Sequence, residues 1–219
     1  MLILCKSPYL EGDKSQKRDY IHRVKTVKVN NNICFRIIVL SLTLVDGWVA
    51  QARCCQSPHF NARPLHEVSL LVIHNISLPA GCFGQPYIDQ LFQGCLDIEA
   101  DTSFKDLQGL EVSAHFLIRR DGELVQYVSC DDRAWHAGVS EFEGRSNCND
   151  FALGIELEGT DALAYSEEQY LRLIELTRSL MVHYPDITLA RITGHSDIAP
   201  GRKTDPGNGF DWQRYKAAL

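Results

Sequence analysis

The last third of the chain contains a stretch whose residue types could bind a metal ion. Residues 191–206 read RITGHSDIAPGRKTDP, with His195 and Asp205 separated by a loop that contains proline and glycine. Histidine and carboxylate side chains are good ligands for a divalent metal such as zinc. Lys203 precedes Asp205 by two residues, so in an extended segment it lies beside whatever Asp205 binds. A metal site needs at least one further ligand.

His74 is the predicted further ligand. It lies near the end of an apolar run rich in β-branched residues, which the sequence LPAG at 78–81 interrupts. His195 also follows a short apolar segment, and the ends of strands are where sites form in open α/β sheets. Two histidines and one carboxylate, with a fourth position left for water, are the ligand set of a catalytic zinc site. We therefore expect one Zn²⁺ per chain, bound by His74, His195 and Asp205.

A zinc hydrolase also needs a general base and a group that stabilises a developing oxyanion. Glu156, in the segment FALGIELEG at 151–159, is the predicted base, and Lys203 is predicted to neutralise the oxyanion. The alternatives are a solvent-facing or arginine-paired glutamate and a solvated lysine. Glu156 and Glu158 could instead be the acid pair of a glycosidase, since they lie about 6–7 Å apart on a strand. Two acids on one strand flank a sugar bond poorly, which disfavours that interpretation.

The remaining six histidines have less distinctive settings. We interpret His115 as a core histidine within a strand, and His136 could line a pocket together with Trp135. The other four are interpreted as surface or structural residues: His22, His59, His66 and His183.

Strands and helices must bring the candidate ligands, the base and the lysine together, because these residues are far apart in the sequence. The apolar patterns predict strands over 68–76, 112–118, 123–128, 151–159 and 192–195. They predict helices over 86–93, 166–183 and 212–218, and residues 47–53 could form a short helical turn. The Asp-Gly pair at 121–122 is a hairpin signal. Ser166 and Gln169 fit a capping box at the start of the longest helix.

Charge is divided unevenly along the 219 residues. Residues 1–44 carry eight Lys/Arg and three Asp/Glu, whereas residues 45–219 carry 14 and 25. We expect residues 1–44 to be a basic N-terminal extension, disordered or loosely attached, ahead of one domain at 45–219. Another interpretation is that the natural protein starts near residues 42–45. The acidic domain argues against a nucleic-acid partner.

Membrane insertion and export are not expected. The longest apolar run, residues 37–45, is far shorter than the roughly 20 residues of a membrane span. It is also a poor signal peptide, because a long polar segment precedes it. The eight cysteines form no C-x-x-C pair, so we interpret them as mostly free thiols in a reducing compartment. These features predict a cytoplasmic protein with no membrane partner.

Five segments, in chain order, resemble a known family. They read VIHNISLP at 72–79, SAHFLIRRDGELVQYV at 113–128, RAWHAG at 133–138, GIELEGTD at 154–161 and TGHSDIAPGRKTDPG at 193–207. They are similar to the zinc-dependent N-acetylmuramoyl-L-alanine amidases, a superfamily that includes peptidoglycan recognition proteins. The resemblance is strongest to the cytosolic 1,6-anhydro-N-acetylmuramoyl-L-alanine amidases of cell-wall recycling. It covers about residues 45–219.

The resemblance implies an α/β (α+β) fold, in which helices flank a mixed central β-sheet, as in the amidase and peptidoglycan-recognition-protein fold. It implies hydrolysis of the amide between (1,6-anhydro)-N-acetylmuramic acid and L-alanine in an anhydro-muropeptide. By position, the zinc ligands, the catalytic glutamate and the lysine near the scissile carbonyl are the five residues chosen above: His74, His195, Asp205, Glu156 and Lys203. Three more positions match residues that line the sugar and peptide site: Asn75, Trp135 and Ala199.

Two positions depart from the family pattern. An arginine expected to hold a stem-peptide carboxylate is Asn147 here, with Arg145 close enough to replace it, and Glu111 stands where a basic residue is common. Two alternative functions are a non-catalytic peptidoglycan-binding module and an exported lytic amidase that acts on intact cell wall. The complete ligand set favours an enzyme over the binding module. The lack of a proper export signal and the unpaired cysteines favour the cytoplasm.

Overall fold

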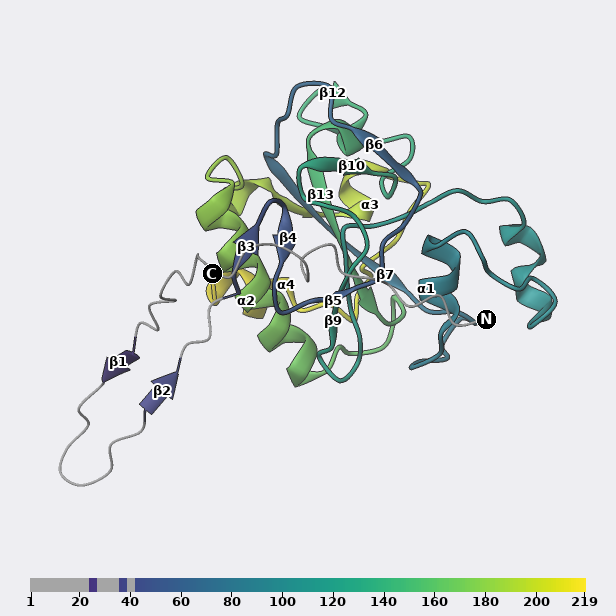
Figure 1. Ribbon diagram of the computed structural model, residues 1–219, viewed down its shortest axis with the longest axis horizontal. Coiled ribbons are helices and arrows are strands. Elements are labelled where there is room, and N and C mark those ends of the chain that lie inside the picture. The colour runs from purple at the N-terminus through teal and green to yellow at the C-terminus, as the bar shows by residue number, and fades with distance from the viewer. Residues whose placement is uncertain (1–23, 27–35, 39–41) are drawn as a thin grey trace, which may run out of the picture.

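A six-stranded mixed sheet forms the centre of the computed structural model, which describes residues 24–26, 36–38 and 42–219 (Figure 1). Its strands, in spatial order, are β14 (Ile192–Gly194), β7 (Leu70–Ile76), β13 (Ala152–Glu158), β8 (Phe116–Ile118), β9 (Leu124–Gln126) and β5 (Arg53–Cys54). The first four run parallel, β9 is antiparallel to β8, and β5 is parallel to β9. The expected mixed sheet is confirmed.

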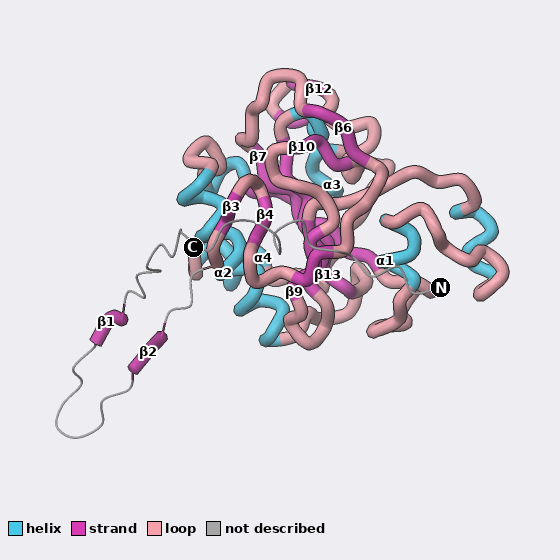
Figure 2. The backbone as a smooth tube through the Cα atoms, viewed as in Figure 1, coloured by secondary structure: helices cyan, strands magenta, loops and turns pink. Residues whose placement is uncertain are grey.

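Helices and small strand pairs accompany this sheet. The helices are α1 (Tyr87–Phe92), α2 (Glu167–His183), α3 (His195–Ile198) and α4 (Trp212–Ala217), with 3-10 turns η1 (Thr102–Leu107), η2 (Cys148–Asp150) and η3 (Leu189–Arg191). The pairs are β1 (Val24–Thr26) with β2 (Arg36–Ile38), β3 (Leu44–Val45) with β4 (Trp48–Val49), β6 (Phe60–Ala62) with β10 (Asp132–Ala134), and β11 (Glu141–Phe142) with β12 (Arg145–Ser146). Figure 2 shows the strands of the six-stranded sheet at the centre of the domain, with long loops between the elements around them.

The two faces of the sheet have different coverings. Alternate residues of a strand point to opposite faces, so Leu71 and Ile73 of β7 join the main core with apolar residues of α2 and α4. Leu70 and Val72 point the other way, into a smaller cluster that includes Ile198 of α3. Figure 1 shows α2 and α4 together on one side of the sheet and α1 on the other. The candidate site lies on the face opposite α2.

Helix α2 begins and ends where local sequence signals predict. The Ser166 hydroxyl accepts a hydrogen bond from the backbone N–H of Gln169 at 3.1 Å, and the Gln169 side chain accepts one from the Ser166 backbone, also at 3.1 Å. This is the predicted capping box. Pro185 follows the helix and prevents its continuation. No helix in the described parts of the chain is long and apolar enough to cross a membrane.

The prediction of a helical turn at residues 47–53 is wrong, because this segment contains β4 and the start of β5. Gly47 has a φ of +75°, a conformation that suits glycine, and it turns the chain between β3 and β4. Arg53 and Cys54 then join the central sheet beside β9. These pairings are tertiary, so the local pattern did not show them.

The expected extension at 1–44 falls mostly outside the described residues. At its end, Leu42 is 5% exposed and belongs to the main core, and its carbonyl accepts a hydrogen bond from the Ser179 hydroxyl at 2.9 Å. Leu42 therefore packs as part of the domain, although the predicted extension included it. The assignment of the preceding residues to a separate extension stays a prediction.

Two leucines of α2 provide a matched test of this packing. Leu173 is fully buried in the main core, whereas Leu171 is 60% exposed. We expect Leu173→Ala to lower the free energy of unfolding by about 2–5 kcal/mol, because it leaves a cavity. Leu171→Ala should change it by less than about 0.5 kcal/mol. Urea denaturation of both variants measures the difference, and similar losses would contradict the described burial of α2.

Candidate metal centre

The register of three parallel strands places the central candidate residues at one edge of the sheet. β13 pairs with β7 so that Glu156 lies opposite His74, and β14 pairs with β7 so that Gly194 lies opposite Ile73. His74 and Glu156 point to the same face, because they are neighbours in register. His195 comes directly after Gly194. Two ligand candidates and the base candidate therefore meet at the carboxyl ends of adjacent strands.

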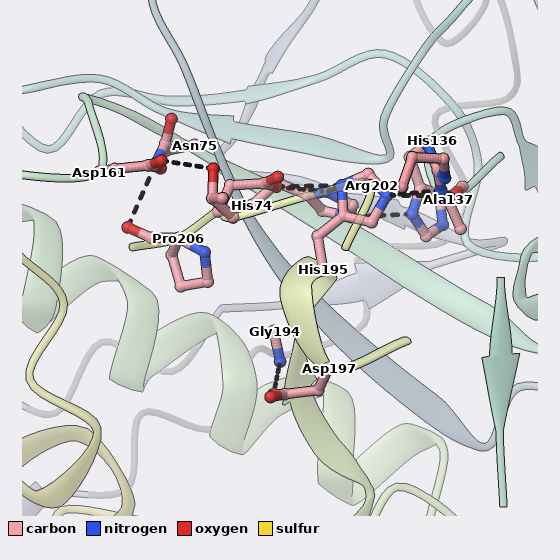
Figure 3. Close-up of polar contacts among 12 residues, drawn as sticks. His74, Asn75, His136, Ala137, Asp161, Gly194, His195, Asp197, Arg202 and Pro206 are labelled. Atoms are coloured by element: carbon pink, nitrogen blue, oxygen red, sulfur yellow. Dashed lines mark hydrogen bonds and ion pairs between the residues drawn. The ribbon is translucent and has the colours of Figure 1, made fainter. Parts of the chain in front are cut away.

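The sequence predicted that His195 ends a strand, and this is wrong: β14 ends at Gly194, and His195 begins the short helix α3. The carboxylate of Asp197 accepts a hydrogen bond from the Gly194 backbone N–H at 2.9 Å (Figure 3). It accepts a second from the Thr193 hydroxyl, also at 2.9 Å. Such a cap satisfies N–H groups that the first helical turn leaves open. It fixes the point at which the chain leaves β14, and with it the direction of the His195 side chain.

The loop that carries Asp205 is attached to the same short helix. The backbone N–H of Ser196 donates to the Asp205 carbonyl at 2.9 Å. A Cβ atom at Gly194 would lie only 2.9 Å from Cδ of Pro206, so glycine is needed for this loop to approach. The third ligand candidate thus reaches the first two, although it is 131 residues from His74 in the chain.

Three potential ligand atoms converge at this point. Nδ1 of His74 is 2.9 Å from Nδ1 of His195, and these nitrogens lie 3.2 and 3.0 Å from Oδ2 of Asp205. Among the residues that the structure describes, this is the one group of histidine, cysteine and acidic side chains arranged to hold a metal. Tetrahedral ligands about 2.0–2.1 Å from zinc lie about 3.3 Å from one another. The observed spacing is close to that value.

Protons alone do not satisfy the three contacts. If only one of the two imidazole Nδ1 atoms carries a proton, the other Nδ1 and the Asp205 oxygen face each other as two acceptors. If both Nδ1 atoms carry a proton, they face each other as two donors at 2.9 Å. A cation removes this conflict because all three atoms then present lone pairs to it. The residues present therefore fit a divalent metal.

The protonation states of the ligand candidates also suit metal binding. Burial lowers the pKa of His74 to about 4, against the opposing effect of Asp205. Burial also acts to raise the pKa of Asp205, but hydrogen bonds with His195 and His74 outweigh it and hold the pKa well below its usual range. At neutral pH His74 is uncharged and Asp205 is ionised, which are the forms that bind metal.

Glu156 is buried beside these atoms with its carboxylate incompletely paired. It is 8% exposed, and its Oε2 has no hydrogen-bond partner among the described residues. Burial raises the pKa of Glu156 well above its usual value, the charge of Asp205 raises it further, and Lys203 acts in the opposite direction. A raised pKa and an unsatisfied buried oxygen are typical of a functional carboxylate.

Glu158, on the same face of the same strand, has a different environment. Its carboxylate pairs with Arg119 at 3.2 Å and accepts from the backbone N–H groups of Gly84 at 2.7 Å and Arg120 at 3.1 Å. These contacts satisfy the buried charge, so Glu158 has a structural role. The glycosidase interpretation, which needs two reactive acids, finds no support here.

A cleft of about 570 Å³ opens beside the ligand candidates. It is lined by residues of three segments, namely the end of β7 with the loop that follows it (Asn75–Ser77 and Ala80), Gly159–Ala162, and Arg202–Asp205. Lys203 is exposed and lines this cleft together with Asp205. A substrate in the cleft can therefore reach Asp205 of the ligand set and the lysine.

The three predicted substrate-binding residues have different settings. Asn75 lines the cleft, and its amide donates to Asp161 at 2.8 Å and to the Pro206 carbonyl at 3.2 Å (Figure 3). Trp135 is half-buried, and Ala199 is 5% exposed in the turn after α3; neither lines this cleft. Asn75 thus holds two loops of the cleft together.

Two residues that the sequence did not link to the ligands contact the outer ring nitrogens of the two histidines. Nε2 of His74 lies 3.0 Å from Nδ1 of His136, and Nε2 of His195 lies 3.1 Å from the Ala137 carbonyl. Their one signal in the sequence was the motif RAWHAG, which suggested only that His136 lines a pocket.

Arg145, the suggested substitute for a peptide-binding arginine, pairs with Glu67 at 2.7 Å, and its guanidinium lies over the ring of Phe151.

Convergent ligand atoms beside a buried carboxylate, at the edge of a mixed sheet, are the arrangement of a metal-dependent hydrolase. Comparison with known proteins gives the family. The N-acetylmuramoyl-L-alanine amidase family matches residues 64–208, and the chain belongs to it.

Curated relatives and solved structures agree with this assignment. The chain is 57% identical over 179 residues to the 1,6-anhydro-N-acetylmuramyl-L-alanine amidase AmpD of Escherichia coli (strain K12), covering 81% of this chain and 97% of that protein. The crystal structure of a selenomethionine AmpD derivative matches with a TM-score of 0.80 at 56% identity, over 81% of this chain and 99% of that one. A complex of the E. coli amidase AmiD with anhydro-N-acetylmuramic acid-L-Ala-D-gamma-Glu-L-Lys also matches. Its TM-score is 0.51 at 26% identity, and the match covers 81% of this chain and 65% of that chain.

The two glutamates of β13 should respond differently when their charge is removed. In the metal-free protein we expect Glu158→Gln to lower the free energy of unfolding by about 1.5–3 kcal/mol, because it breaks charged hydrogen bonds in a buried site. Glu156→Gln should not lower it, because it removes a buried charge without a full set of partners. Chemical denaturation measures both. A larger loss for Glu156→Gln would show that its carboxylate is satisfied.

Proposed function

We propose that this chain hydrolyses the amide bond between 1,6-anhydro-N-acetylmuramic acid and L-alanine of anhydro-muropeptides, in peptidoglycan recycling. One observation carries the proposal: the ligand atoms of His74, His195 and Asp205 lie about 3 Å from one another. Beside them lies Oε2 of Glu156, which has no hydrogen-bond partner among the described residues. The high identity to AmpD proteins over nearly their whole length supports the choice of substrate. The peptide that accompanies AmiD in its complex has the same anhydro sugar and L-alanine linkage.

We propose that His74, His195 and Asp205 hold one Zn²⁺ per chain. Nitrogen ligands from two neutral histidines and one carboxylate oxygen are a catalytic zinc set that leaves a position open. When bound, zinc supplies Lewis acidity that polarises the scissile carbonyl and makes water easier to deprotonate.

Glu156 is the proposed general base and acid. Its carboxylate takes a proton from the water that attacks the carbonyl carbon of the scissile amide. When the carbon–nitrogen bond breaks, the same proton passes to the departing amine of L-alanine. A carboxylate with a raised pKa suits both steps, because it can accept the proton and later release it.

Lys203 is proposed to stabilise the oxyanion of the tetrahedral intermediate. Its ammonium group is exposed in the cleft, and it acts electrostatically on both Glu156 and His74. A positive charge aimed at a developing oxyanion lowers the barrier without needing to move during the reaction.

The proposed substrate contacts are Asn75, Trp135 and Ala199. Asn75 is supported by its place in the cleft. Trp135 is half-buried, and its indole N–H donates to Asn61 at 2.8 Å, which fixes the ring. A fixed aromatic ring suits contact with a sugar. Ala199 is supported by the resemblance alone.

We further propose that the reaction takes place in the cytoplasm and that residues 45–219 form the catalytic domain, with 1–44 as a separate extension. Four of the described cysteines are free thiols, as expected in a reducing compartment: Cys82, Cys95, Cys130 and Cys148.

Two substitutions separate the roles of base and ligand. Glu156→Gln should retain zinc but lower kcat by about 10²–10⁴-fold, because proton transfer is lost. Asp205→Ala should lose the metal itself. Elemental analysis and mass spectrometry of released stem peptide measure the two effects, with exposed Glu168→Gln as a control. A near-normal kcat for Glu156→Gln would show that another group is the base.

A further inference from the structure

The dipeptide His136-Ala137 contacts the outer nitrogens of both histidine ligands. Nδ1 of His136 lies 3.0 Å from Nε2 of His74, and the carbonyl oxygen of Ala137 lies 3.1 Å from Nε2 of His195 (Figure 3). Both contacts are on the side of the imidazole opposite the ligand atom. One short segment therefore orients two ligands.

When Nδ1 of each ligand faces a metal, these contacts determine which ring nitrogen carries the proton. A carbonyl oxygen only accepts hydrogen bonds, so His195 donates from Nε2 to Ala137 at 3.1 Å, and its Nδ1 presents a lone pair to the ligand set. The guanidinium of Arg202 lies farther from the same nitrogen, at 3.5 Å, and donates to the Ala137 carbonyl at 2.7 Å. Nδ1 of His74 must present a lone pair as well, so its Nε2 must carry the proton. His136 then has to accept that hydrogen bond at Nδ1.

Nothing else among the described residues explains the orientation of the His136 ring by a hydrogen bond. Its other nitrogen, Nε2, is buried and has no partner there. Ring-to-ring packing limits the position of His136, because its centroid lies 5.0 Å from that of His74 and 5.6 Å from that of His115. Among the described residues, the contact with His74 is thus the hydrogen bond that this half-buried side chain makes.

Several contacts hold the dipeptide in place. The side-chain oxygen of Asn149, which is 6% exposed, accepts from the backbone N–H groups of His136 at 3.2 Å and Ala137 at 2.8 Å. The guanidinium of Arg202 donates to the Ala137 carbonyl at 2.7 Å and to the Val139 carbonyl at 2.6 Å. The segment is therefore fixed by its backbone and does not depend on the His136 side chain.

Strand β13 has a glycine, Gly154, where the His136 ring packs against it. A Cβ atom at Gly154 would lie 2.5 Å from Cγ of His136, closer than real Cβ contacts. The His136 ring therefore occupies the space that a side chain at 154 would fill. This position is two residues before Glu156, on the same face of the strand.

We propose that His136 is a positioning residue that accepts the Nε2 proton of His74 and so prepares His74 for metal binding. Metal-binding histidines usually donate their other N–H to a carboxylate, a backbone carbonyl or water. Here a neutral imidazole takes that role for His74, while the next residue supplies the carbonyl for His195. The inference rests on the proposed zinc site.

Two substitutions of His136 separate hydrogen bonding from packing. His136→Phe keeps an aromatic ring over Gly154 but removes the acceptor, whereas His136→Asn loses the ring but places an amide oxygen where Nδ1 was. We expect His136→Phe to bind Zn²⁺ about 10–100-fold more weakly in competition with a chromophoric chelator. His136→Asn should regain most of the affinity. The visible spectrum of Co²⁺-loaded protein should change for His136→Phe and stay close to that of the unaltered protein for His136→Asn.

Gly154→Ala gives an independent test from the opposite side. Its methyl group displaces the ring, so it should weaken Zn²⁺ binding in the otherwise unaltered chain. The same change should cause no further loss in a His136→Ala background, where no ring is present. Equal losses in both backgrounds would show that Gly154 acts without His136 and would contradict the proposal.

The outcomes distinguish this inference from the proposed function. If the unaltered chain binds Zn²⁺ and His136→Phe binds it equally well, the role of His136 is wrong while the zinc site stands. If His136→Phe and His136→Asn lose affinity equally, packing and not hydrogen bonding is responsible. If the unaltered chain does not bind Zn²⁺, both proposals fail. Unfolding temperatures of all variants identify any that do not fold, and the Gly154→Ala pair then decides.

Discussion

The parallel register of β14, β7 and β13 is the constraint on which the site depends. It sets Glu156 beside His74 and brings the end of β14, and hence His195, to the same edge of the sheet. A shift of one residue in either pairing would turn a side chain to the opposite face. The apolar residues on that opposite face pack against α2 and hold the register. The packing of the core and the geometry of the site are therefore one problem.

The same strand shows how the fold separates structural from reactive charge. Glu158 is surrounded by donors, with Arg119 as its ion-pair partner, whereas Glu156 keeps one oxygen without a partner in the described part of the chain. The two residues share a face and similar burial. Their difference lies in what the neighbouring loops supply. A site of this kind costs stability, which the large core on the other face of the sheet offsets.

Local signals in the sequence were sufficient for the main elements, and residue type and spacing selected three side chains that the fold brings together. The apolar run before His74, the capping box at Ser166 and the Asp-Gly turn at 121–122 each act over a few residues, and the structure contains all three elements. Residues 47–53 were misassigned because their strands exist only through distant pairing. His136 gave no sign of its contact with His74, because that contact joins residues 62 positions apart. Residue type and spacing thus indicated the chemistry, while the residues that orient it became visible only in the folded chain.

The most direct test is mass spectrometry of anhydro-muropeptide incubated with the purified, zinc-loaded chain, with chelator-treated protein and muropeptide with an intact reducing end as controls. We expect stem peptide to be released from the anhydro substrate with zinc and not after chelation. We expect little release from the muropeptide with an intact reducing end. An anhydro substrate that stays intact with the zinc-loaded protein, or that is cleaved equally after chelation, would contradict a metal-dependent amidase at this site.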